Sequence, residues 1–102
     1  VIFIDSYGNA ITNITREIFA RVFESRSFRI LIKNNRYYSE KICRRYSDEP
    51  VGEIVTRFNT LDLLEVSING ANLCQLFGVD TGDAVRVEAR DDTGDTGGLF
   101  KN

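Results

Sequence analysis

The 102-residue sequence contains no histidine, methionine or tryptophan, a single proline and only two cysteines. Without histidine the commonest general base at neutral pH is missing, so chemistry carried by this chain alone would need carboxylates, tyrosine or lysine. Cys43 and Cys74 are isolated in the sequence, which argues against a structural zinc site. We therefore expect no metal, and the cysteine usage favours a reducing, cytoplasmic compartment over a disulfide framework.

Long apolar runs and a strong net charge are also absent. No segment approaches the roughly 18 apolar residues of a membrane span and no signal-peptide pattern occurs, so we expect no membrane association. The net charge of −2 indicates neither disorder nor a dominant attraction to nucleic acid. The length suits one domain with a single core. Because the chain starts at Val1 on a predicted strand, without an initiator methionine, we expect it to be a piece of a longer protein.

Short stretches in which apolar and polar residues alternate predict a mainly β fold. Strands are predicted at 1–5, 11–14, 28–32, 53–59, 63–68 and 84–88, and segment 36–46 is either a strand or a short helix. A short helix follows a cap at Thr15, and a second begins at the N-cap Asn69 and ends at Gly78. The pattern is typical of a small antiparallel barrel or sandwich. We predict a Greek-key-like β-barrel of five to seven strands with one or two short helices over residues 1–90, followed by a loose tail over 91–102.

Three features could carry binding chemistry. The turn from Asp5 to Asn9 holds a carboxylate, an aromatic ring, a glycine and an amide, and an amide suits the edge of a purine, although residue types alone favour an ordinary polar turn. The stretch from Arg26 to Tyr46 is basic and aromatic, as in surfaces that bind single-stranded nucleic acid, but we favour a solvated strand face. We interpret Glu65, in the middle of an apolar strand, as a solvent-facing acid.

Three segments resemble one family in their order and spacing: IDSYGNAITNI (4–14), YSDEPVGE (46–53) and FNTLDLLEVSINGANLCQLFGVDTGDAVRVE (58–88). They are similar to the C-terminal domain of the S-adenosyl-L-methionine (SAM) hydroxide adenosyltransferases, which are related to the bacterial fluorinase and chlorinase. The resemblance implies a homotrimer, with the active site between this domain and the N-terminal α/β domain of a neighbour. The substrate would be SAM, with no further cofactor, and the products adenosine and L-methionine. Residues that activate water would lie in the N-terminal domain, so this chain alone would be inactive.

The resemblance also implies roles for individual residues. Asn9 would bind the adenine edge, Tyr46 would flank its ring, and the backbone from Ile68 to Gly70 would complete the adenine site. Tyr7 would pack beside the substrate and Asp5 would pair with its ammonium group. Asn59 and Thr60 would approach the methionine carboxylate. No catalytic residue is assigned to this chain.

Two departures from the related halogenating enzymes bear on the reaction. Leu61 and Ile68 stand where that branch carries arginines, which favours hydroxide over halide as the nucleophile. Asp62 adds a negative charge near the proposed carboxylate position. The rival interpretation is a small barrel that binds single-stranded nucleic acid or a protein partner through the face between Arg26 and Tyr46. A domain that serves only oligomerisation is the third.

Overall fold

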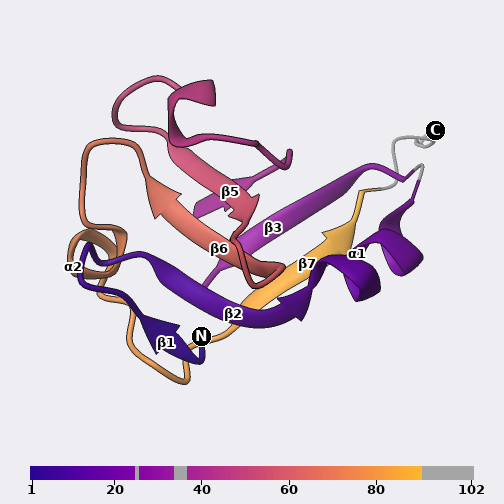
Figure 1. Cartoon of the computed structure of the whole chain (residues 1–102), viewed down its shortest axis with the longest axis horizontal. Coiled ribbons are helices and arrows are strands. Elements are labelled where there is room, and N and C mark those ends of the chain that lie inside the picture. The colour runs from indigo at the N-terminus through magenta and orange to yellow at the C-terminus, as the bar shows by residue number, and fades with distance from the viewer. Residues whose placement is uncertain (25, 34–36, 91–102) are drawn as a thin grey trace, which may run out of the picture.

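The computed structural model describes residues 1–24, 26–33 and 37–90, and most of its elements are labelled in Figure 1. The strands are β1 (Phe3–Ile4), β2 (Ala10–Thr15), β3 (Phe28–Ile32), β4 (Tyr37–Ser39), β5 (Ile54–Phe58), β6 (Leu63–Ile68) and β7 (Val85–Ala89). The helices are α1 (Arg16–Phe23), α2 (Leu73–Phe77) and the single 3₁₀ turn η1 (Tyr46–Asp48). The predicted tail, 91–102, lies outside the described residues.

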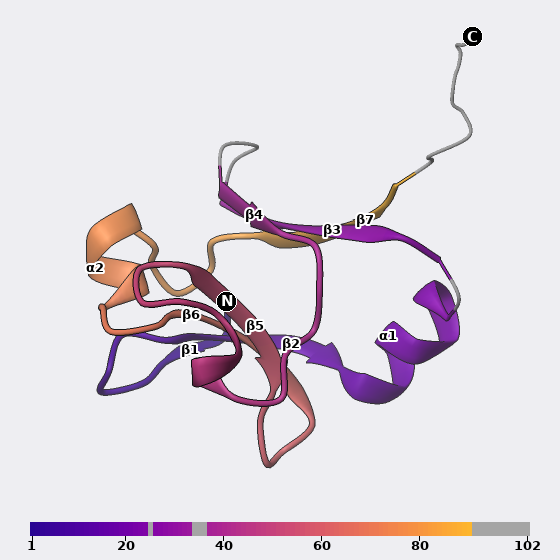
Figure 2. The ribbon, with the colours of Figure 1, turned by 90° about the horizontal axis from the view of Figure 1, so that it is seen from above.

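The strands form two antiparallel sheets, with the orders β1-β2-β6-β5 and β4-β3-β7. Figure 2 shows the sheets as two layers, with the segment that carries η1 on the outer side of the four-stranded sheet. The mainly β, antiparallel fold with two helices is confirmed. A closed barrel is not, because no ladder joins the two sheets among the described residues. Ser39 on the short strand β4 instead meets Thr56 on β5 through their hydroxyl groups, 2.8 Å apart.

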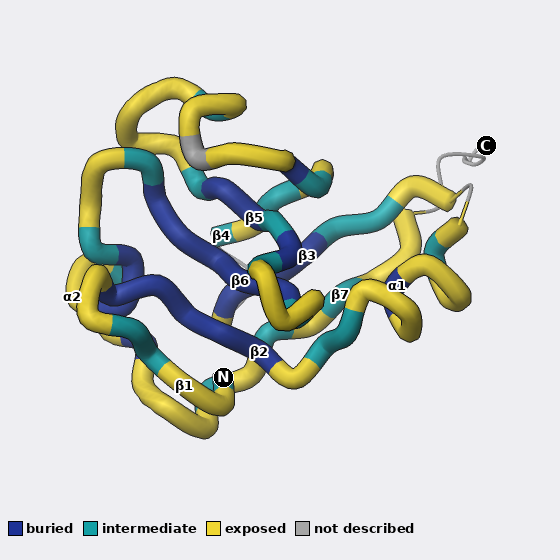
Figure 3. The backbone as a smooth tube through the Cα atoms, in the orientation of Figure 1, coloured by how far each residue is buried: buried dark blue, intermediate teal, exposed yellow. Residues whose placement is uncertain are grey.

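The core fills the space between the sheets. One cluster gathers around Ile32, Val66 and Leu73, and a second gathers Phe19 from α1 with Ile30 and Leu64. Figure 3 shows nearly all of β6 and the first half of β2 in the colour of buried residues. Because neighbouring side chains on a strand point to opposite faces, the residues of β6 between the core positions are directed to the outer side of the sheet.

The helix caps are set by side chains that accept backbone hydrogen bonds. Thr15 is confirmed as the N-cap of α1, since its Oγ1 accepts from the Ile18 amide at 3.1 Å. The prediction of Asn69 as the N-cap of α2 is wrong, because Asn72 takes that position and accepts from Gln75 N at 2.8 Å. Gly78 ends α2 in the left-handed conformation, with φ +66°, as predicted.

The segment 36–46, left open between strand and helix, contains a short strand and then irregular chain up to a 3₁₀ turn. Its described part begins with β4 and continues to η1, where the Asp48 carboxylate accepts from the amides of Arg44 and Arg45 at 2.9 and 3.1 Å. These two hydrogen bonds hold the pKa of Asp48 below its ordinary value. The first predicted strand is shorter than expected, since only Phe3–Ile4 pairs with β2. Within the described ranges no helix is long and apolar enough to cross a membrane.

Candidate functional site

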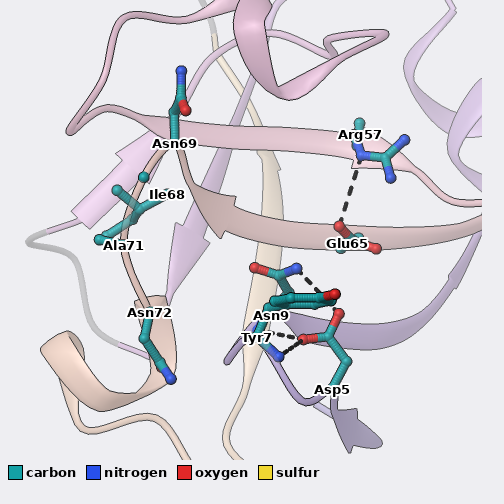
Figure 4. A pocket seen from close by; sticks show the side chains of 10 residues that line it. Asp5, Tyr7, Asn9, Arg57, Glu65, Ile68, Asn69, Ala71 and Asn72 are labelled. Atoms are coloured by element: carbon teal, nitrogen blue, oxygen red, sulfur yellow. Dashed lines mark hydrogen bonds and ion pairs between the residues drawn. The ribbon is translucent and has the colours of Figure 1, made fainter.

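An open pocket with a volume of about 720 Å³ lies at the outer face of the four-stranded sheet, a size that suits a small-molecule ligand. Figure 4 shows the side chains around it. The pocket is lined by Asp5, Tyr7, Asn9, Arg57, Glu65, Ile68, Asn69, Gly70, Ala71 and Asn72. It therefore combines the turn before β2, the middle of β5 and β6, and the corner before α2.

The Asp5 carboxylate organises the turn before β2. Its Oδ1 accepts from the backbone amides of Tyr7 and Asn9, both at 2.9 Å, and its Oδ2 accepts from Asn9 Nδ2 at 3.1 Å. The last bond orients the side-chain amide of Asn9, which is only 5% exposed. Tyr7, in contrast, is 77% exposed at the rim of the pocket.

Gly8 joins this turn to the first turn of α2. Its φ is +81°, and a Cβ atom there would lie 1.8 Å from Asn72 Oδ1. The Gly8 carbonyl accepts from the Cys74 amide at 3.0 Å. Glycine is therefore required at position 8 both by the backbone conformation and by the close approach of Asn72.

The corner after β6 forms the opposite wall. Asn69 is bonded through both backbone groups to the loop before β5, since its amide donates to Glu53 O at 3.1 Å and its carbonyl accepts from Gly52 N at 2.8 Å. Gly70 follows with φ +84°. Among the described residues no hydrogen bond uses the Gly70 amide, so this group can meet a ligand.

Glu65 and Arg57 form a charged pair that sequence reasoning missed. The prediction of a solvent-facing Glu65 is wrong: the residue is 4% exposed, and its Oε2 lies 3.7 Å from Arg57 Nε on the adjacent strand. In Figure 4 the acid lies between Arg57 on β5 and the turn before β2 that carries Asp5 and Asn9. The available signal was the position of Arg57 directly opposite Glu65 in the register of the predicted hairpin.

The structure brings five of the eight predicted site residues together and places two others, Asn59 and Thr60, elsewhere. Asp5, Tyr7, Asn9, Ile68 and Gly70 line the pocket. The side chain of Tyr46 lies outside the described part of the structure.

The two residues predicted to approach the methionine carboxylate lie at the opposite end of β6. Asn59 closes the β5–β6 turn, with its Oδ1 accepting from Leu61 N and Leu63 N at 2.9 and 3.1 Å, and Thr60 is exposed in that turn. Asp62, in the same turn, forms an ion pair with Arg16 at 3.0 Å. This pair partly neutralises the negative charge at that end of the strand.

Three bases of the stretch from Arg26 to Tyr46 pair with acids. Arg29 contacts Glu40 at 2.9 Å, Lys33 contacts Asp83 at 3.7 Å, and Lys41 contacts Glu49 at 2.7 Å. These ion pairs leave less positive charge for phosphate groups. The structure therefore gives no specific support to the nucleic-acid alternative, and the solvated-face interpretation stays a prediction.

Residues 1–86 match the family model of the SAM hydroxide adenosyltransferase C-terminal domain. The chain belongs to this family. No curated protein matches this SAM hydroxide adenosyltransferase C-terminal domain. In fold it is similar to an uncharacterized conserved protein from Thermotoga maritima, with a TM-score of 0.67 and 23% identity over 84% of this chain and 33% of that one. It is also similar to a conserved hypothetical protein from Thermus thermophilus, with a TM-score of 0.59 and 22% identity over 84% of this chain and 32% of that one. The domain thus spans about a third of the length of these structures.

Proposed function

We propose that this domain supplies the adenine- and methionine-binding surface of a SAM hydroxide adenosyltransferase. The reaction would convert SAM and water to adenosine and L-methionine. The water oxygen bonds to C5′ of the ribose, the C5′–sulfur bond breaks with its electron pair going to sulfur, and the water gives up a proton. The family resemblance assigns water activation to a different domain, so the domain would bind substrate without catalysing the reaction alone.

The observation that carries this proposal is the pocket itself. The structure brings together, in one hollow, the turn and the corner that the resemblance assigns to adenine and to the ammonium group, although they are about sixty residues apart in the chain. In this proposal the Asn9 amide, oriented by Asp5, meets the adenine edge, and the Gly70 amide provides a second hydrogen-bonding group. Asp5 is the anion for the substrate ammonium.

The open form of the pocket supports the proposal that a second surface completes the site. Tyr7 and Val51 are 77% and 79% exposed, and Val51 lies next to Gly70 at the pocket corner. Exposed apolar side chains at the rim of a pocket are typical of surfaces that become covered in an assembly. We propose that the natural protein acts as a cytoplasmic homotrimer in which a neighbouring subunit covers this rim.

The test incubates the complete natural protein with SAM in water labelled with oxygen-18. The products are separated by chromatography, and their masses are measured by mass spectrometry. Adenosine that carries one labelled oxygen at the 5′ position is the expected product. Adenosine without the label would refute transfer to water, and the absence of adenosine from folded protein would refute the activity.

The contribution of this domain is tested by Asn9→Ala, with Asn13→Ala as the control at an exposed position of the strand that follows, β2. Loss of the amide should weaken adenosine binding about tenfold, because a hydrogen bond of this kind contributes about 1 to 1.5 kcal/mol. Asn13→Ala should leave binding unchanged. Equal affinities of the two variants for adenosine would show that Asn9 does not bind adenine.

A further inference from the structure

We propose that Glu65 selects the charge of the ligand: its carboxylate recognises the positive sulfonium centre of SAM and favours SAM over neutral thioethers. This inference rests on the proposed function and adds a residue to which neither the sequence nor the family resemblance gave a role. It starts from the position of Glu65 on the pocket side of β6, opposite in direction to the core residues Leu64 and Val66.

A structural role alone does not account for an acid at this position. Glu65 is 4% exposed, and burial of an ionised carboxylate is costly unless other charges compensate for it. A buried ion pair is often no more stable than an apolar pair of similar volume. Ile11, which lies opposite Glu65 on β2, and Val55 on β5 already bury apolar side chains on this face. An apolar residue at position 65 would therefore suit the fold.

Glu65 is paired with Arg57 and also lines the pocket. The distance of 3.7 Å from Arg57 Nε to Glu65 Oε2 is that of an ion pair and longer than a hydrogen bond. In Figure 4 the carboxylate lies between Arg57 on one side and Asn9 with Asp5 on the other. A carboxylate has about four positions at which it can accept, so the pairing of Glu65 with its protein neighbours is compatible with a cation at the pocket.

The charges that line the pocket complement those of SAM. Two acids, Asp5 and Glu65, and one base, Arg57, give the lining a net charge of 1 − 2 = −1. SAM carries a sulfonium, an ammonium and a carboxylate, a net charge of +1. Since the resemblance assigns Asp5 to the ammonium, Glu65 is the remaining acid for the sulfonium. When the C5′–sulfur bond breaks, sulfur becomes neutral, so the attraction to Glu65 is lost as product forms.

The experiment compares SAM with S-adenosyl-L-homocysteine, which lacks the sulfonium methyl and its charge but keeps the adenine, ribose and amino-acid groups. Binding of both is measured by calorimetry on the complete natural protein and on Glu65→Gln, which keeps the shape of the side chain. Glu65→Gln should weaken the binding of SAM about tenfold and the binding of S-adenosyl-L-homocysteine less than about twofold. Glu88→Gln, on the exposed strand β7, is the matched control and should change neither.

Kinetics separate this role from a merely structural one. Because the sulfonium charge decays as the bond to C5′ breaks, Glu65 stabilises bound substrate more than the transition state. Glu65→Gln should therefore raise KM and leave kcat unchanged or higher. A fall in kcat at constant KM would overturn the inference. So would an equal loss of affinity for both ligands, or no loss of affinity for either.

Two further outcomes remain decisive. If Glu65→Gln does not fold, Arg57→Gln provides the second test, because it keeps the acid and removes the competing cation. Arg57→Gln should then prefer SAM over S-adenosyl-L-homocysteine at least as strongly as the wild type does. Loss of this preference in Arg57→Gln would overturn the inference. If the folded wild type binds neither ligand, the proposed function itself fails and the inference with it. Binding of SAM without any effect of Glu65→Gln leaves the function standing and refutes only this inference.

Discussion

Substitution of Gly8 by alanine should be among the most damaging single changes in the turn of the candidate site. The φ of +81° costs a residue with a Cβ atom about 1 to 2 kcal/mol. The new atom would also displace Asn72, and loss of that N-cap adds about 1 kcal/mol. Together these terms predict a destabilisation of roughly 2 to 3 kcal/mol, which lowers Tm by about 10 to 20 °C in a domain of this size.

Urea unfolding followed by far-ultraviolet circular dichroism measures this cost, with Gly82→Ala as the matched control. Gly82 has a similar positive φ of +94°, but no atom lies within 4 Å of the position its Cβ would take. Gly82→Ala therefore reports the backbone term alone, about 1 to 2 kcal/mol. The difference between the variants isolates the displacement of Asn72. Equal destabilisation by the two substitutions would refute the proposed contact between the turn and α2.

Three further predictions concern the charged pair, a helix cap and a loop acid. Arg57→Met alone should destabilise the fold by about 3 kcal/mol, because it leaves Glu65 buried without this cation. The double variant Arg57→Met with Glu65→Leu should have a stability close to that of the wild type. A lower urea midpoint for the double variant than for Arg57→Met would contradict this prediction. Thr15→Ala should cost about 1 kcal/mol by thermal unfolding, since it removes the N-cap of α1, and an unchanged Tm would contradict it. The lowered pKa of Asp48 stabilises the fold above the ordinary carboxylate pKa, and this stabilisation is lost as the pH falls through the lowered pKa. Asp48→Asn should therefore lose less stability than wild type between pH 6 and pH 3 in urea titrations, and identical pH profiles would contradict this.

The strands and the caps that depend on local sequence were predictable. Thr15 and Gly78 act within their own helices, so residue type and spacing were sufficient. The cap of α2 was not predictable in the same way, because two asparagines compete for it. Asn69 is instead held by contacts with Glu49 and Glu53, which are 16 or more residues away in the chain. A distant hydrogen bond thus decided between two residues of equal local preference.

The candidate site was predictable where it follows a compact motif and not where it depends on coverage by another segment. The turn from Asp5 to Asn9 is closed by its own side chains, so its residues could be identified together. An alternating strand looks the same whether its polar face meets water or another segment of the chain. Glu65 was therefore assigned to solvent. The closed barrel was not confirmed for a similar reason, because strand pairing between sheets depends on register that periodicity does not contain.

The alternation along β6 has a consequence for how such a domain can change during evolution. Leu64 and Val66 hold the two sheets together, whereas Glu65 between them faces the pocket. Under the proposed role of Glu65, a substitution at this position would alter what the pocket recognises while the core contacts of Leu64 and Val66 stay in place. Because Glu65 is paired with Arg57, a new specificity at position 65 would need a matching change at position 57 to keep the fold stable.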